Sequence, residues 1–142
     1  MATRTATPIP TQAPALSPER PVTWPKRTKT RLANGLEVVL AESHAIPKFH
    51  GQLSFRSGNA AVVDRGPGLA EMTASVVRTG TKLRVSRQIE EDLRRMGADL
   101  SSSAGADTSG IGFAGLSELA EPLLGLVNEL AREASFPERS RD

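Results

Sequence analysis

The 142-residue sequence contains no cysteine, and aromatic residues make up only 4% of it. The absence of cysteine excludes a disulfide scaffold and a zinc site built from thiolates. Because aromatic side chains are so few, the core must be built from Leu, Val, Ile and Ala. The length allows one domain or part of one. The formal net charge of +2 at pH 7 is nearly balanced and gives no basis for a nucleic-acid surface.

Long apolar runs are missing as well. No stretch approaches about 18 apolar residues, so the sequence predicts no transmembrane helix. The first 27 residues hold six of the ten prolines among Thr, Ala and Ser, and we expect a disordered or extended tail over residues 1–27. This tail lacks the apolar segment of a secretory signal, so the compartment stays unknown.

Histidine is scarce. The two histidines, His44 and His50, lie six residues apart in a segment interpreted as strand and turn. They do not have the i, i+4 spacing that would place both on one helical face. A surface or strand-edge role is therefore favoured over metal binding.

Alternating and turn-rich patterns predict the strands. Residues 29–32 and 36–40 flank Asn34-Gly35, which predicts a β-hairpin with a type I′ turn. Residues 52–56 alternate and predict the next strand. Residues 98–103 and 108–116 predict a second hairpin around Gly105, rich in small side chains.

Three segments have helical periodicity. Residues 69–79, between Gly66-Pro67-Gly68 and Gly80, predict a short helix that is buried on most sides, with Gly80 as a left-handed terminator. Residues 87–96 predict an amphipathic helix with Ser86 as the N-cap and Gly97 after its end. A third helix is predicted over 119–134. The apolar stripes of these three helices are Leu69, Met72 and Val76; Ile89, Leu93 and Met96; and Leu119, Leu123, Leu126, Val127 and Leu130.

Together these elements predict an α+β fold, with helices packed on a largely antiparallel sheet. We expect three regions: the tail over 1–27, a domain over 28–138 and a charged stub over 139–142.

The first predicted helix resembles the motif helix of the insulinase–pitrilysin family of zinc metallopeptidases, which includes the mitochondrial processing peptidases. In active members this helix reads roughly G-L-A-H-x-x-E-H-x-x-x-x-G-T. Gly68-Leu69-Ala70 and Gly80-Thr81 match at the right spacing. The other matching segments are Leu32-Ala33-Asn34-Gly35-Leu36-Glu37-Val38, Phe55-Arg56-Ser57-Gly58, the G-A-x-L-S-A-x-x-x-x-D-like run that ends at Asp107, and Phe136-Pro137-Glu138.

The chemical positions of the motif do not match. Glu71 stands where the first zinc-binding histidine would be, Ala74 replaces the glutamate base, and Ser75 replaces the second histidine. Ala74 cannot act as a base, Ser75 is a poor zinc ligand, and Glu71 alone could supply one oxygen. The family's further glutamate ligand would lie beyond residue 142. We therefore expect no catalytic residue, no metal site and no cofactor in this chain, with zinc confined to an active partner or relative.

The resemblance implies the front part of one domain that forms half of a peptide-enclosing chamber. Such an incomplete domain would leave an apolar face or a sheet edge open. Three functions remain open. The chain is a non-catalytic homologue that contributes to peptide binding and processing beside a zinc-bearing partner, a truncated gene product without activity, or a stand-alone module that adds a peptide to its sheet edge. The resemblance also allows an exported, periplasmic location.

Overall fold

The computed structural model describes residues 17–19 and 21–136 in two compact units, one ending at Ser43 and the other beginning at His44. Most of the expected tail, residues 1–16 and 20, lies outside the described residues, as does the stub over 139–142. The described residues before Arg27 form no helix or strand and are exposed. The expected boundaries near residues 28 and 138 stay predictions. Within the described residues, each helix is too short or too polar to cross a bilayer.

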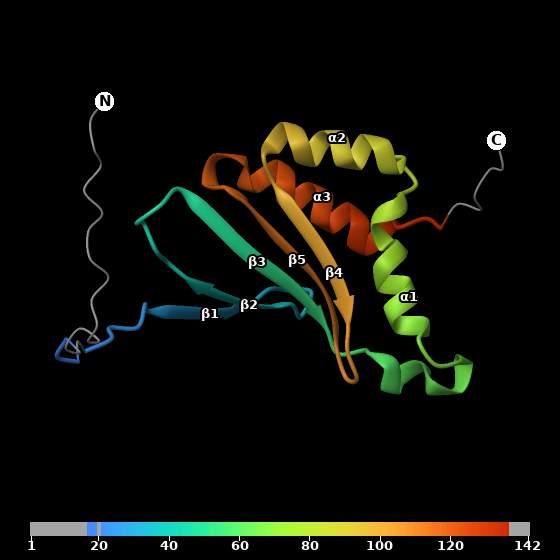
Figure 1. Cartoon of the computed structure of the whole chain (residues 1–142), viewed down its shortest axis with the longest axis horizontal. Helices are drawn as coiled ribbons and strands as arrows, with labels where there is room; N and C mark the ends of the chain where they lie inside the picture. Colours follow the sequence, from blue (N-terminus) through green and yellow to red (C-terminus); the bar gives the residue numbers. More distant parts are fainter. Residues whose placement is uncertain (1–16, 20, 137–142) are drawn as a thin grey trace, which may run out of the picture. The chain divides into compact units, whose positions relative to one another are not determined.

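The first unit is a β-hairpin of β1 (Arg27–Arg31) and β2 (Glu37–Ala41), paired antiparallel (Figure 1). Gly35 closes its turn, donating its N–H to the Leu32 carbonyl at 2.9 Å with a φ of 86°. Among the described residues only glycines have a positive φ, so Asn34 lacks the left-handed conformation that a type I′ turn requires. The expected turn type is therefore wrong. The Asn34 side chain instead accepts the Leu36 N–H at 3.1 Å.

The second unit contains a three-stranded antiparallel sheet in the order β3-β5-β4. Its strands are β3 (Lys48–Phe55), β4 (Asp99–Ala104) and β5 (Ser109–Leu116). The hairpin predicted around Gly105 is confirmed as β4 and β5, and the strand predicted over 52–56 begins earlier, at Lys48. The register places Ser109 of β5 between Phe55 of β3 and Ala104 of β4.

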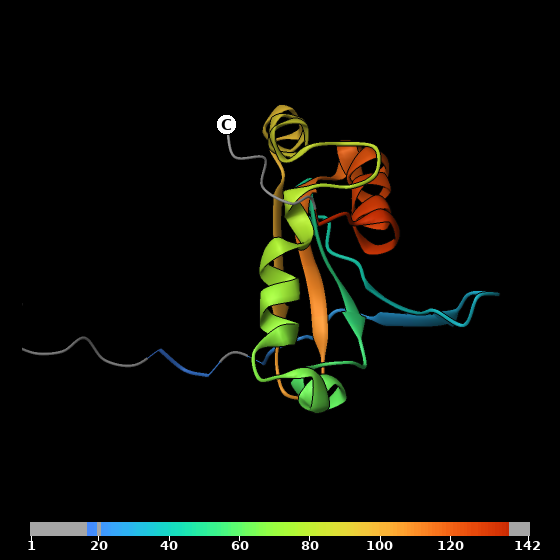
Figure 2. The same ribbon diagram turned by 90° about the vertical axis from the view of Figure 1, so that its right-hand side faces the viewer.

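Helices cover one face of this sheet (Figures 1 and 2). They are α1 (Leu69–Val76), α2 (Ser86–Met96) and α3 (Ala120–Glu133), with the 3₁₀ helices η1 (Asn59–Arg65), η2 (Val77–Thr79) and η3 (Ser117–Leu119). Leu100, Ser102 and Ile111 share the covered face, because alternate strand residues point to the same side and Ser102 pairs with Ile111. The predicted α+β fold is confirmed.

The core lies between this face, α2 and α3. It consists of Ile89, Leu93, Leu100, Ile111, Leu123, Leu126, Val127 and Leu130. The apolar stripes predicted for α2 and α3 therefore supply most of the core. Phe113 packs against it from β5, and its ring occupies the space where Gly51 of β3 would otherwise carry a side chain.

Two helix ends differ from expectation. The N-cap of α2 is Val85, not Ser86, and its N–H is satisfied by the Gln88 side-chain oxygen at 3.0 Å. Gly80 has a φ of 166°, which is extended backbone and not the expected left-handed terminator. Gly97, with a φ of 56°, does end α2 in the left-handed conformation.

The expected burial of α1 is wrong. No residue of α1 is buried, Leu69 is 36% exposed and Met72 is 65% exposed. The helix faces the sheet through its alanine side, where Ala70 and Ala74 are half-buried. Periodicity identifies the apolar stripe, but the described residues leave Leu69 and Met72 exposed and bury Val76 only in part.

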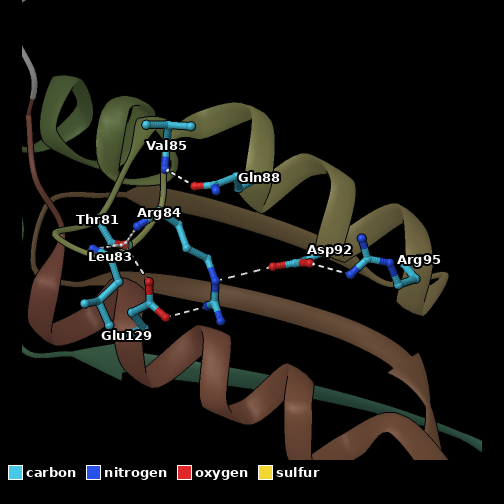
Figure 3. Close-up of polar contacts among 8 residues, drawn as sticks. All are labelled: Thr81, Leu83, Arg84, Val85, Gln88, Asp92, Arg95 and Glu129. Atoms are coloured by element: carbon cyan, nitrogen blue, oxygen red, sulfur yellow. Dashed lines mark hydrogen bonds and ion pairs between the residues drawn. The ribbon is translucent and has the colours of Figure 1, made fainter.

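A buried polar cluster joins the segment after η2 to α3 (Figure 3). Glu129 of α3 accepts a hydrogen bond from the Thr81 hydroxyl and one from the Arg84 guanidinium. The Thr81 hydroxyl oxygen also accepts the backbone N–H groups of Leu83 at 3.1 Å and Arg84 at 2.9 Å. Arg84 Nε lies 3.3 Å from Asp92 of α2. This cluster therefore connects α2, α3 and the segment that leads out of α1.

We expect Leu93→Ala to lower the free energy of unfolding by roughly 2–5 kcal/mol, because it empties a buried leucine site. Leu93 is 5% exposed and packs in the core. Leu124→Ala on α3 is the matched control, since Leu124 is 47% exposed, and we expect about 1 kcal/mol or less. Urea denaturation measures both. An unchanged midpoint for Leu93→Ala would mean that this side of α2 is not part of the core.

We expect Glu129→Ala to destabilise the fold by about 2–3 kcal/mol, since it removes the acceptor for Thr81 and Arg84 in a largely buried cluster. Glu133→Ala, one helical turn further along α3, is the matched control. Glu133 pairs with Lys82 at 2.8 Å on the surface, where ion pairs contribute little. Equal effects of the two substitutions, measured by thermal and urea unfolding, would contradict the special role of Glu129.

The ion pair between Glu133 and Lys82, which the control variant removes, also contributes to stability in a way that depends on pH. The hydrogen bond and charge of Lys82 hold the pKa of Glu133 below its ordinary value. The small contribution of this pair is therefore present at neutral pH and is lost as the pH falls through the lowered pKa.

Candidate functional site

The three degenerate motif positions lie on α1. Glu71 and Ser75 are exposed and are one helical turn apart, and Ala74 is half-buried against the sheet. Glu71 accepts a hydrogen bond from the Asn59 side-chain amide. The Ser75 hydroxyl donates to the Met72 carbonyl at 2.7 Å, within its own helix. The Ala74 carbonyl accepts the Ser102 hydroxyl of β4 at 2.6 Å. These contacts join α1 to η1, to β4 and to its own backbone.

Within the part of the chain that the structure describes, no three His, Asp or Glu side chains come together in a group that could hold a metal ion. His44 precedes β3 and His50 lies on the exposed side of β3, whereas Glu71 is on α1. A catalytic zinc site normally has three protein ligands and an open position. The described residues offer no such set around Glu71.

Gly58 fixes the start of η1 against the β4–β5 turn. A Cβ atom at this position would lie 2.5 Å from the carbonyl oxygens of Gly105 and Ala106. The next two N–H groups, of Asn59 and Ala60, donate to the same carbonyls at 2.9 Å. This close approach requires glycine and places Asn59 within reach of Glu71.

A cavity of about 440 Å³, open to solvent, lies between the motif helix α1, helix α3 and the covered face of the sheet. Its apolar surface comes from α1, α3, η1, β3 and β5. The lining apolar residues are Phe55, Val62, Leu69, Ala70, Ala74, Val77, Ile111, Leu130, Ala131, Ala134 and Phe136. This size lies within the roughly 300–1,000 Å³ range of small-molecule and side-chain sites.

The cavity exists because the sheet side chains become smaller along the covered face. Leu100 and Ile111 fill the space under α2 and α3, but the next residues on this face are Ser102, Ala104 and Ser109. The small side chains let α1 approach the sheet, and they leave space between α1 and α3. Apolar surface is therefore accessible in this cavity and at Leu69 and Met72.

Polar groups in the cavity are few. Five residues line it with hydroxyl groups: Ser57, Thr73, Ser102, Ser103 and Ser109. Arg65, at the end of η1, is the one charged residue among the described residues that line the cavity.

Sequence reasoning missed this cavity and Arg65. The run of small residues at 101–110 was a usable signal, because small side chains on the covered face of a sheet reduce packing. Which helices lie over these small residues depends on tertiary structure. The periodicity of the sequence therefore could not predict that α1 and α3 border a cavity there.

The fold occurs in solved bacterial structures. One is a peptidase M16 inactive domain from Pseudomonas fluorescens, with a TM-score of 0.74 and 26% identity over 80% of this chain and 28% of that chain. Another is the periplasmic protease PqqL from Escherichia coli, with a TM-score of 0.72 and 18% identity over 78% and 12%. A third is a protease from Helicobacter pylori, with a TM-score of 0.72 and 20% identity over 80% and 27%.

No protein-family model matches the sequence, and no curated protein matches it. The resemblance to the insulinase–pitrilysin peptidases is nevertheless confirmed, because the neighbour of 26% identity is a peptidase M16 inactive domain. The other two neighbours show the fold alone. The chain spans less than a third of the length of each of these three neighbours. The similarity to an inactive domain supports a non-catalytic homologue of this family.

We expect the purified protein to retain no stoichiometric zinc after dialysis, because Ala74 and Ser75 occupy two of the three chemical positions of the motif. Elemental analysis by inductively coupled plasma mass spectrometry measures the zinc content. One tightly held zinc per chain, lost on treatment with a chelator, would contradict the expectation.

Proposed function

We propose that this chain is a non-catalytic homologue of M16 peptidases that contributes peptide contacts beside a zinc-bearing partner. The observation that carries the proposal is the state of the motif helix. The scaffold positions Gly68 and Gly80-Thr81 match the family, whereas Ala74 and Ser75 replace the base and one metal ligand. The similarity to the inactive domain from Pseudomonas fluorescens supports the same interpretation.

The cavity beside α1 supports the proposed peptide contact. The cavity beside α1 is open and mostly apolar, and few polar groups line it. Ligand sites typically combine an apolar wall with a small number of polar groups. Binding a peptide here would not require any of the missing catalytic side chains.

Alone, the chain should not hydrolyse peptides, and the triple variant Glu71→His, Ala74→Glu, Ser75→His should not gain this activity. The variant would supply two histidine ligands and a base, but a catalytic site needs a third protein ligand. Two ligands bind zinc weakly and leave the water poorly positioned. The assay is cleavage of a quenched fluorescent peptide library by the wild-type chain, the triple variant and each protein after chelation.

The same cleavage assay also tests the role beside a zinc-bearing partner. The wild-type chain mixed with a zinc-bearing M16 homologue from the same organism should raise the turnover of that homologue. The wild-type chain, heat-denatured before mixing, is the control for non-specific effects. Chelator-sensitive cleavage by the isolated wild-type chain would overturn the non-catalytic assignment. No change in the mixture would overturn the partner role and favour a truncated product.

A further inference from the structure

We propose that the cavity between α1 and α3 binds a bulky apolar side chain of a peptide, with a neighbouring carboxylate held by Arg65. This inference rests on the proposed function and specifies the peptides that it would select. It is carried by the wall of the cavity, by its size and by the single charge among its described lining residues.

The wall of the cavity selects an apolar group. Phe55 and Phe136 line it, and the small alanines of α1 and α3 leave the central space open. Both phenylalanines are more than one-third exposed, so their rings present apolar surface that a ligand can cover. Removing this surface and an apolar side chain from water together is favourable by about 25 cal/mol per Å².

The charge of the cavity selects an anion beside that group. Arg65 is exposed, and none of the described residues forms an ion pair with it. The nearest carboxylate on α1, Glu71, instead accepts the Asn59 amide. Arginine is well suited to a carboxylate because its planar guanidinium can donate two parallel hydrogen bonds.

Two of the five hydroxyls that line the cavity are already used as donors within the protein. The Ser102 hydroxyl donates to the Ala74 carbonyl, and the Thr73 hydroxyl donates to the Leu69 carbonyl at 2.8 Å. Their protons are used within the protein, and their oxygens remain as weak acceptors. Arg65 is therefore the strongest donor available to a ligand in the cavity.

The carboxylate could be the C-terminus of a peptide or an acidic side chain. Four fluorescein-labelled peptides distinguish the sources: Gly-Ser-Ala-Phe with a free carboxylate, the same peptide as an amide, Gly-Ser-Ala-Ser with a free carboxylate, and Gly-Ser-Phe-Asp-Ser as an amide. Fluorescence anisotropy measures each dissociation constant. Decanoate, added as a competitor, tests whether a fatty acid occupies the cavity instead.

We expect the peptide ending in Phe to bind at least about tenfold more tightly than the peptide ending in Ser, because it buries an aromatic side chain. Arg65→Ala should leave the Gly-Ser-Ala-Phe amide unchanged and weaken by about threefold the Phe-containing peptide that supplies the carboxylate, since a partly exposed ion pair contributes modestly. Weakening of Gly-Ser-Ala-Phe with a free carboxylate identifies the C-terminus as the source, and weakening of Gly-Ser-Phe-Asp-Ser identifies an acidic side chain. If the effect of Arg65→Ala requires the peptide carboxylate, the guanidinium and the carboxylate interact directly. Arg87→Ala, which removes a highly exposed arginine from α2, is the matched control.

A second pair of variants tests the cavity itself. Ala74→Leu adds a side chain inside the cavity and should abolish binding, whereas Ser75→Leu adds the same side chain to an exposed position outside the lining. Thermal unfolding verifies that both variants are folded. If Ala74→Leu does not fold, the comparison of wild type and Arg65→Ala on peptides with and without a carboxylate tests the inference by itself.

Equal binding of all four peptides would overturn this inference and leave the proposed partner role intact. So would equal effects of Arg65→Ala on the Gly-Ser-Ala-Phe amide and on both Phe-containing peptides that carry a carboxylate. Displacement by decanoate at concentrations below the dissociation constant of the peptide would overturn the peptide assignment. Selective binding without stimulation of a zinc-bearing homologue would support the inference and overturn the partner role alone.

Discussion

The arrangement of the helices depends on the Glu129 carboxylate. It lies on the same side of α3 as the core leucines, where an unpaired charge would be strongly unfavourable. The Thr81 hydroxyl and the Arg84 guanidinium both donate to it, and Thr81 accepts two backbone N–H groups in return (Figure 3). The cluster thereby fixes the conformation of the segment between η2 and α2. The end of α1, and with it one wall of the cavity, is positioned relative to α3 by these contacts.

A change in side-chain size divides the covered face of the sheet into two parts. Under α2 and α3, Leu100 and Ile111 fill the interior and complete the core. Towards the β4–β5 turn, Ser102, Ala104 and Ser109 leave space, and α1 is attached by the hydrogen bond between Ser102 and Ala74. Apolar packing stabilises the first part, whereas the second part is held by polar contacts and remains open. The candidate binding site is therefore also the part of the domain with the weakest packing.

Sequence patterns predicted the elements whose stability is local or strongly periodic. The α2 stripe at Ile89 and Leu93, the left-handed Gly97 and the hairpin around Gly105 could all be identified from spacing and turn chemistry. The burial of α1 could not, because an apolar stripe indicates which side seeks cover and not whether another segment supplies it. Glu129 was missed for a related reason. A charged residue in an apolar stripe becomes acceptable only when partners 45 and 48 residues away are brought to it.

The family resemblance separates backbone requirements from chemical ones. Gly58 matches because the carbonyls of Gly105 and Ala106 leave no room for a side chain, and Gly68 matches at a left-handed N-cap with a φ of 79°. Thr81 matches at the centre of the Glu129 cluster. None of these roles involves zinc. The positions that differ, Glu71, Ala74 and Ser75, are those whose family roles are chemical. Here Ala74 fits beside the sheet, Ser75 is exposed and Glu71 accepts the Asn59 amide. The residues that fix the backbone of the motif helix and its surroundings are therefore different from the residues that carry the family's chemistry.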